Sequence, residues 1–143
     1  MLTTNQKGAI AETAIAHEAI KLGIGVYRPY GDERYDLIFD LRPKLLRVQC
    51  KWAPLDGDVV TIRCYSSRRA RTGLGRRLYS SDEIDAFAAY CLELNTCYFL
   101  PMNEVSGPEI HLRCAPARNN QRRRINWAKD YEFAAKLNPL PGP

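Results

Sequence analysis

The sequence predicts an α/β (α+β) fold in which a mixed central sheet is flanked by helices, in the order α-β-β-β-(β)-α-β-β-α. Two observations lead to this fold class. Some segments space apolar residues as a helix does, and short segments between them alternate apolar and polar residues as strands do. The chain has 143 residues, 45% hydrophobic and 26% charged, which is typical of one globular unit. We therefore expect a single domain over residues 1–137 and a Pro-rich tail at 138–143.

The first element is predicted to be a helix that begins after Thr3. Thr3 and Gln6 have the spacing of a capping box, and Gly23 ends the helical pattern. Glu12 lies on the apolar face of this helix, where an ionised carboxylate is costly unless a partner or a metal ion accompanies it. The other residues of that face are Gly8, Ala11, Ile15, Ala19 and Leu22.

The remaining elements follow from short patterns along the chain. Strands are predicted at residues 26–30, 35–41, 45–52, 59–64, 96–100 and 109–114. A second helix is predicted from Ser80, because Glu83 completes a capping-box spacing. Its apolar stripe would consist of Ile84, Phe87, Ala88 and Cys91. A third helix is predicted at 127–136, where Trp127, Tyr131 and Phe133 are expected to make core or dimer contacts.

The hairpin formed by 35–41 and 45–52 is expected to carry the functional residues. Gln49 and Lys51 point to one side of its second strand, whereas Cys50 faces the core. Asp36 is expected near the far end of the hairpin, level with Lys51. A helix packed on the same face would bring Glu12 to them, so that carboxylate, amide and ammonium groups share one sheet edge.

These groups suit the hydrolysis of phosphodiesters with the help of Mg²⁺. Mg²⁺ prefers hard oxygen ligands and keeps several waters. It polarises the phosphate and makes a water more acidic, while a neighbouring lysine orients that water and offsets negative charge. Each residue alone also has an ordinary explanation, as a turn residue, a solvent-facing polar group or a surface charge.

Asp36, then Gln49-Cys50-Lys51, preceded by the helical Glu12, resembles the PD-(D/E)XK nuclease superfamily, whose restriction-endonuclease-like fold has an αβββαβ core. Residues 79–101 resemble its group I intron homing endonuclease branch and related bacterial endonucleases. The resemblance spans roughly residues 5–127.

The resemblance implies that Glu12, Asp36 and the backbone carbonyl of Cys50 help to hold Mg²⁺, or Mn²⁺ as a substitute. Gln49 would be a ligand or contact a ligand, and Lys51 would orient the attacking water. Two positions depart from the family pattern: Tyr35 replaces a proline and Gln49 replaces an acid. Because an amide offers an oxygen but no charge, the second departure predicts weaker metal binding or one ion instead of two.

The net charge of +5 conceals an uneven distribution. Residues 63–77 hold six arginines and no acid, and residues 113–129 hold six bases and no acid, which leaves nine bases against all sixteen acids elsewhere. Such segments favour a polyanion such as duplex DNA, although a solvated loop and a basic helix explain the charge equally well. Residues 66–78 are expected to form a mobile loop.

The predicted DNA contacts come from both basic segments. Arginine suits phosphate oxygens, whereas Asn119 and Asn120 carry amides that pair with adenine edges or, alternatively, form a polar turn. The predicted DNA-binding residues are Arg68, Arg69, Arg71, Arg76, Arg77, Arg118, Asn119, Asn120, Arg122, Arg123 and Arg124.

The sequence therefore predicts a Mg²⁺-dependent DNA endonuclease, homing-like or restriction-like. Cutting two strands further predicts a homodimer or a higher homo-oligomer. Three alternatives stay open: a Holliday junction resolvase-type nuclease, a non-catalytic DNA-binding protein whose Gln49 marks a degenerate site, and an RNA nuclease.

The sequence also carries expectations about the cellular compartment. Five cysteines without a Cys-x-x-Cys pair argue against disulfides and a cysteine zinc site, and they are interpreted as core packing in a cytoplasmic protein. His17 and His111 lack metal-ligand spacing. No apolar segment is long enough to span a bilayer, and the first residues do not resemble a signal peptide, so no membrane partner is expected.

Overall fold

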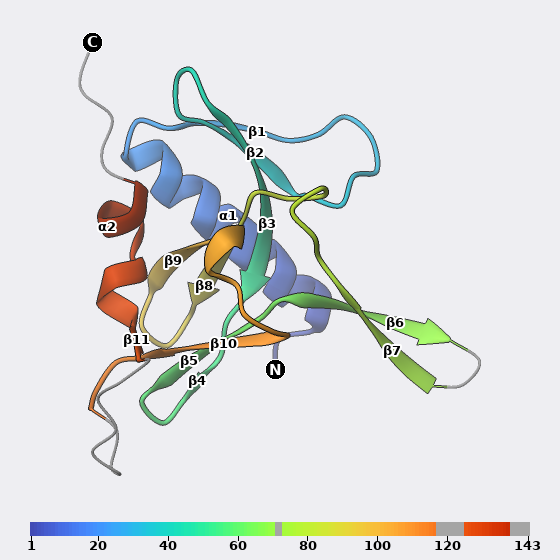
Figure 1. Ribbon diagram of the computed structural model, residues 1–143, viewed down its shortest axis with the longest axis vertical. Helices are drawn as coiled ribbons and strands as arrows, with labels where there is room; N and C mark the ends of the chain where they lie inside the picture. Colours follow the sequence, from blue (N-terminus) through green and yellow to red (C-terminus); the bar gives the residue numbers. More distant parts are fainter. Residues whose placement is uncertain (71–72, 117–124, 138–143) are drawn as a thin grey trace.

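The computed structural model describes residues 1–70, 73–116 and 125–137, and within these the side chains of 68–70, 73 and 74 are outside the description. The expected tail at 138–143 lies outside the described residues. The fold is a mixed α/β structure, which confirms the predicted class (Figure 1). Its helices and main strands are α1 (Thr4–Lys21), β1 (Gly25–Tyr27), β2 (Leu37–Asp40), β3 (Leu45–Trp52), β4 (Leu55–Asp56), β5 (Val59–Arg63), β6 (Tyr65–Ala70), β7 (Gly73–Leu78), β8 (Ala86–Cys91), β9 (Thr96–Pro101), β10 (Glu109–Arg113), β11 (Asn126–Trp127) and α2 (Phe133–Leu137).

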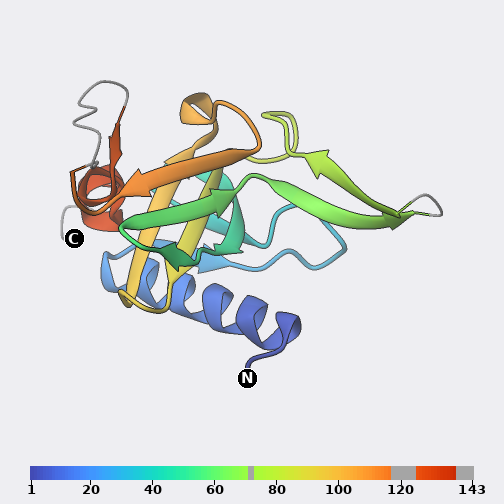
Figure 2. The ribbon, with the colours of Figure 1, turned by 90° about the horizontal axis from the view of Figure 1, so that it is seen from below.

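A five-stranded sheet of order β1-β2-β3-β8-β9 forms the centre of the protein. Only β3 and β8 pair in parallel within it, and the other neighbours are antiparallel. α1 covers one face, and a smaller sheet of order β11-β10-β5-β4 lies over the other (Figure 2). None of the described helices is long and apolar enough to cross a membrane.

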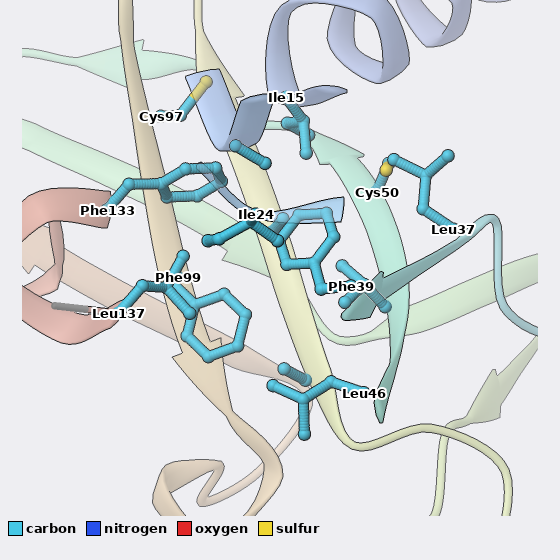
Figure 3. Packing of buried hydrophobic residues seen from close by; sticks show 14 of the residues in the cluster. Ile15, Ile24, Leu37, Phe39, Leu46, Cys50, Cys97, Phe99, Phe133 and Leu137 are labelled. Atoms are coloured by element: carbon cyan, nitrogen blue, oxygen red, sulfur yellow. The ribbon is translucent and has the colours of Figure 1, made fainter. Parts of the chain in front are cut away.

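The core on the α1 side forms as the helix pattern predicts. Thr3 accepts from the N–H of Gln6 while the Gln6 side chain accepts from the N–H of Thr3, so the capping box is confirmed. The small face of α1 then packs against β3, β8 and β9, and the same core includes Leu37 and Phe39 of β2 (Figure 3). Phe39 and Phe99 stack at the centre, and Phe133 of α2 meets both rings edge-on.

The helix predicted from Ser80 is wrong, because residues 86–91 form the buried strand β8. The predicted capping contact is present, since the side chain of Glu83 accepts a hydrogen bond from the N–H of Ser80. However, Ala86, Ala88 and Tyr90 enter the α1-side core, whereas Phe87, Ala89 and Cys91 enter the core of the smaller sheet. A strand buried on both faces is apolar throughout and does not alternate. The fold therefore lacks the second helix of the expected αβββαβ order within the described residues.

The expected mobile loop at 66–78 is instead a two-stranded ribbon, formed by β6 and β7 in antiparallel register. The ribbon projects from the body of the protein (Figures 1 and 2). At the C-terminal end, the helix predicted at 127–136 is only partly present. The chain forms β11, a 3₁₀ turn at Ala128–Tyr131 and then α2, because Glu132 takes an extended conformation and bridges to Tyr98.

The cysteines are all free. Cys50, Cys64, Cys91 and Cys97 are buried, in agreement with the packing interpretation. Cys114 is exposed, so that interpretation is wrong for this residue: it follows β10 at the end of the smaller sheet.

Candidate active site

Asp36 stands at the open end of the β2–β3 hairpin, immediately before β2. Its backbone N–H donates to the carbonyl of Val48 at 2.9 Å. Its carboxylate oxygen Oδ2 accepts from the N–H of Cys50 at 3.0 Å. Two backbone contacts with β3 therefore fix both the main chain and the side chain of Asp36.

The register of the hairpin differs from the expectation that Asp36 is level with Lys51. Leu37 pairs with Val48, so the next position sets Asp36 opposite Gln49. The reason is the tightness of the turn, in which the N–H of Leu41 already donates to the carbonyl of Lys44.

Glu12 reaches this site from α1, but the helix packs on the other face of the sheet from the one expected. The buried residues of α1 meet Val48 and Cys50, not the face of Gln49 and Lys51. Glu12 and Asp36 nevertheless line one pocket of about 190 Å³, together with Arg28, Pro29, Gly31, Asp32, Glu33 and Tyr35. Asp36 therefore lies between a carboxylate on the helix side and the polar residues of β3.

Arg28 provides the positive charge nearest to Glu12. Its Nε lies 3.3 Å from a carboxylate oxygen of Glu12. The Arg28 side chain is 78% exposed, and such surface ion pairs contribute little to stability. Arg28 can therefore move away from Glu12 at low cost if a cation takes its place.

The environment of Asp36 favours a bound cation. Burial raises the pKa of Asp36, the N–H of Cys50 opposes this, and the neighbouring carboxylate of Glu12 raises the pKa again. Two carboxylates that share a half-buried pocket repel each other. Positive charge between them would relieve both the repulsion and the loss of hydration.

Gln49 offers a third oxygen. Its Oε1 is buried and has no hydrogen-bond partner among the described residues. An unpaired buried acceptor costs about 1–3 kcal/mol, a cost that ligation would remove. The described residues contain no cluster of three or more His, Cys, Asp or Glu suited to a metal. Two carboxylates and an amide oxygen are nevertheless the hard ligands that Mg²⁺ prefers, so the residues present fit this ion.

Lys51 lies on the other side of Asp36 from Glu12. Its Nζ donates to the carbonyl of Tyr65 at 2.7 Å and lies 5.2 Å from the centre of the Tyr79 ring. Burial lowers the pKa of Lys51, and the negative charge of Asp36 partly opposes the shift. Cys50 faces the core as predicted, and burial raises the pKa of its thiol, so it is not a nucleophile.

A sequence profile described as PD-(D/E)XK endonuclease matches residues 2–134. The chain belongs to the PD-(D/E)XK endonuclease family. Among solved structures it is similar to a bacterial homing endonuclease, I-Ssp6803I. The two are 31% identical over 95% of this chain and 93% of that chain, with a TM-score of 0.75. No curated protein matches the chain. The family resemblance predicted from Glu12, Asp36 and Gln49-Cys50-Lys51 is confirmed.

Three further residues adjoin the residues that match the PD-(D/E)XK pattern. Arg28, Arg34 and Tyr79 lie at or beside the site and are not among the residues predicted from the sequence. The one available signal was that Arg34 directly precedes Tyr35 and Asp36. Nothing in the spacing of Tyr79 connects it with Lys51.

Of the predicted DNA-binding residues, the structure describes two side chains. Arg76 and Arg77 are exposed on β7. The guanidinium of Arg76 lies 4.5 Å from the Tyr65 ring, and Arg77 pairs with Glu83 at 3.0 Å. Arg68 and Arg69 belong to β6, with side chains outside the description. Outside the described residues lie Arg71, Arg118, Asn119, Asn120, Arg122, Arg123 and Arg124.

Proposed function

We propose that the protein is a Mg²⁺-dependent DNA endonuclease that hydrolyses phosphodiester bonds at a specific duplex site and that accepts Mn²⁺ as a substitute. The observation that carries the proposal is the position of Asp36. It is held by the Cys50 N–H, shares a pocket with Glu12 and interacts electrostatically with Lys51. Family membership and similarity to a homing endonuclease support the same chemistry.

In this proposal Glu12, Asp36 and Gln49 hold the cation, and the backbone carbonyl of Cys50 is a further ligand. The bound cation supplies positive charge at the scissile phosphate. Asp36 is kept in place for this role by the Cys50 N–H, which donates to Oδ2.

Lys51 acts on the attacking water and on the charge that develops at phosphorus. An ammonium has three donors, and the Tyr65 carbonyl takes one of them. The other two can orient a water and contact a phosphate oxygen, which offsets negative charge in the transition state. The hydrogen bond to the Tyr65 carbonyl restrains the position of the ammonium.

The β6–β7 ribbon is the proposed contact with DNA. Arg76 and Arg77 are exposed on it, and each arginine that neutralises a phosphate makes binding more sensitive to salt. Cleavage of both strands is proposed to need two copies of the chain related by a two-fold axis.

Incubation of supercoiled plasmid with the protein tests the proposed function. Nicked or linear DNA is expected with Mg²⁺ or Mn²⁺ and not with EDTA. Lys51→Ala should lower the rate by about 10²-fold or more, whereas Lys44→Ala, an exposed lysine of the hairpin turn, should cleave like the wild type. No cleavage with any divalent ion, or an unaffected Lys51→Ala variant, overturns the proposal.

The choice of substrate separates the alternatives. Selective cleavage of one long asymmetric site in linear duplex supports a homing-like enzyme, as the similarity to I-Ssp6803I suggests. Preference for a four-way junction would instead indicate a resolvase. Calorimetric titration that finds no Mg²⁺ or Mn²⁺ binding would favour a non-catalytic DNA-binding protein.

A further inference from the structure

Arg34 connects both strands of the ribbon with the segment that leads to Asp36. Its Nη1 donates to the Ser66 hydroxyl on β6 at 3.0 Å, and its Nη2 donates to the Leu78 carbonyl on β7 at 3.2 Å. Its Nε lies 3.0 Å from a carboxylate oxygen of Glu83, an ion pair without hydrogen-bond geometry, and its guanidinium lies 3.7 Å from the Tyr79 ring centre. The side chain is only 23% exposed, so solvent competes weakly for these contacts.

Lys51 is attached to the same end of the ribbon. Its Nζ donates to the carbonyl of Tyr65, the residue before Ser66. Lys51 and Arg34 also lie near the same Tyr79 ring. The two cations therefore hold consecutive residues of β6, one from β3 and one from the segment before Asp36.

We propose that Arg34 is a positioning residue that fixes the base of the ribbon against Lys51 and Asp36. The inference rests on the proposed function, because the positioning by Arg34 would serve to keep DNA that is bound to the ribbon in register with the reacting groups. Arg34 acts through Ser66 and Leu78, and its effect passes to Lys51 through Tyr65.

The chemistry of arginine explains why this residue type is needed. A two-stranded ribbon is marginally stable by itself, so its orientation depends on the contacts at its base. The planar guanidinium can donate to a hydroxyl and to a carbonyl in fixed directions while its charge faces a carboxylate. Lysine carries its donors on a single nitrogen and cannot reach all three.

The test compares Arg34→Met and Arg34→Lys with the matched variant Arg47→Met. Arg47 is 34% exposed and also binds a carboxylate, that of Asp85, and two carbonyls. However, it holds the segment before β8 and not the ribbon. Three quantities are measured: single-turnover cleavage with Mg²⁺ at saturating protein, affinity for the same duplex in Ca²⁺, and hydrogen exchange of the ribbon amides.

Arg34→Met should slow cleavage by about 10- to 100-fold, as expected when reacting groups are misplaced by about 1 Å. Its affinity for DNA should change by less than about threefold, because positioning acts on the rate more than on binding. Exchange at the base of the ribbon should speed up by about tenfold or more. Arg34→Lys should be intermediate, and Arg47→Met should leave the rate and the ribbon exchange unchanged.

Unchanged ribbon exchange in Arg34→Met overturns the inference, and so does an unchanged cleavage rate. An equal loss of rate in Arg47→Met would also overturn it, since the effect would then be general destabilisation. If the wild type cleaves no DNA, the proposed function fails. Hydrogen exchange of the ribbon amides in Arg34→Met then tests whether Arg34 anchors the ribbon. Faster exchange than in the wild type supports this role, and unchanged exchange contradicts it.

Discussion

Replacing Asp36 with asparagine removes a negative charge while preserving the shape of the side chain. The new amide oxygen can still accept the N–H of Cys50, which now donates to Oδ2 at 3.0 Å. Burial and the Glu12 carboxylate raise the pKa of Asp36 despite that hydrogen bond. A raised pKa means that stability falls as pH rises from 3.8 through the pKa of the folded state. The penalty is largest above the pKa of the folded state, so Asp36→Asn should stabilise the metal-free protein at pH 7.

The size of this effect follows from the change of charge. A substitution that improves the charge distribution commonly raises the free energy of unfolding by about 0.5–2 kcal/mol. At this chain length, that gain corresponds to a Tm increase of about 2–8 °C. A ligand present at 100 times its Kd stabilises the folded state by about 2.7 kcal/mol. Since only the wild type should bind Mg²⁺ well, the order of the two Tm values should reverse when Mg²⁺ is added.

The assay is thermal unfolding at pH 7 in EDTA and in increasing Mg²⁺, with cleavage measured on the same samples. Asp36→Asn should lose cleavage by about 10²-fold or more. Asp32→Asn is the matched control, because Asp32 is an exposed carboxylate that lines the same pocket. It should keep both the Mg²⁺-dependent rise in Tm and the activity.

Two results would refute this reasoning. One is a Tm for Asp36→Asn in EDTA that is lower than that of the wild type, which would mean that the carboxylate stabilises the metal-free fold. The other is a Mg²⁺-dependent rise in Tm equal to that of the wild type, which would exclude Asp36 as a ligand.

Three further predictions concern other residues of the site and the ribbon. Gln49→Glu should lower the Mg²⁺ concentration for half-maximal cleavage by about fivefold or more, because it adds a charged ligand; an unchanged requirement would place Gln49 outside the metal site. Arg76→Gln should weaken binding to all duplexes alike and reduce the slope of log K against log salt by about one, and an unchanged slope would exclude a phosphate contact. Because burial lowers the pKa of Lys51 below 10.5, wild-type stability should gain from rising alkaline pH as the unfolded state binds more protons. Chemical unfolding should show that Lys51→Met loses this part of the pH dependence, and a pH profile like that of the wild type would contradict the burial of the ammonium.

Local signals predicted the elements that present the site. The capping residues Thr3 and Gln6 lie three residues apart, and the alternating residues of β3 are consecutive, so both patterns could be recognised without tertiary information. The pairing of Asp36 with β3 follows from a short hairpin, although a tighter turn moved it from Lys51 to Gln49.

The errors arise where distant parts of the chain decide the structure. Residues 86–91 are apolar at every position because β8 is covered by two cores, and this pattern cannot be told from a buried helix by spacing alone. Tertiary packing also decides which face of the sheet α1 covers. Glu12 therefore approaches Asp36 from the side opposite to the one expected. The role of Arg34 depends on the β6–β7 ribbon, whose sequence lacks the alternation of apolar and polar residues that predicts a strand.

The position of the cation in crystals grown with Mn²⁺ tests the proposed site most directly. Anomalous scattering should place one Mn²⁺ ion in contact with the carboxylates of Glu12 and Asp36 and with Oε1 of Gln49, next to the Lys51 ammonium. A Mn²⁺ ion bound elsewhere, or an empty site in crystals of an enzyme that cleaves DNA with Mn²⁺, would contradict this assignment.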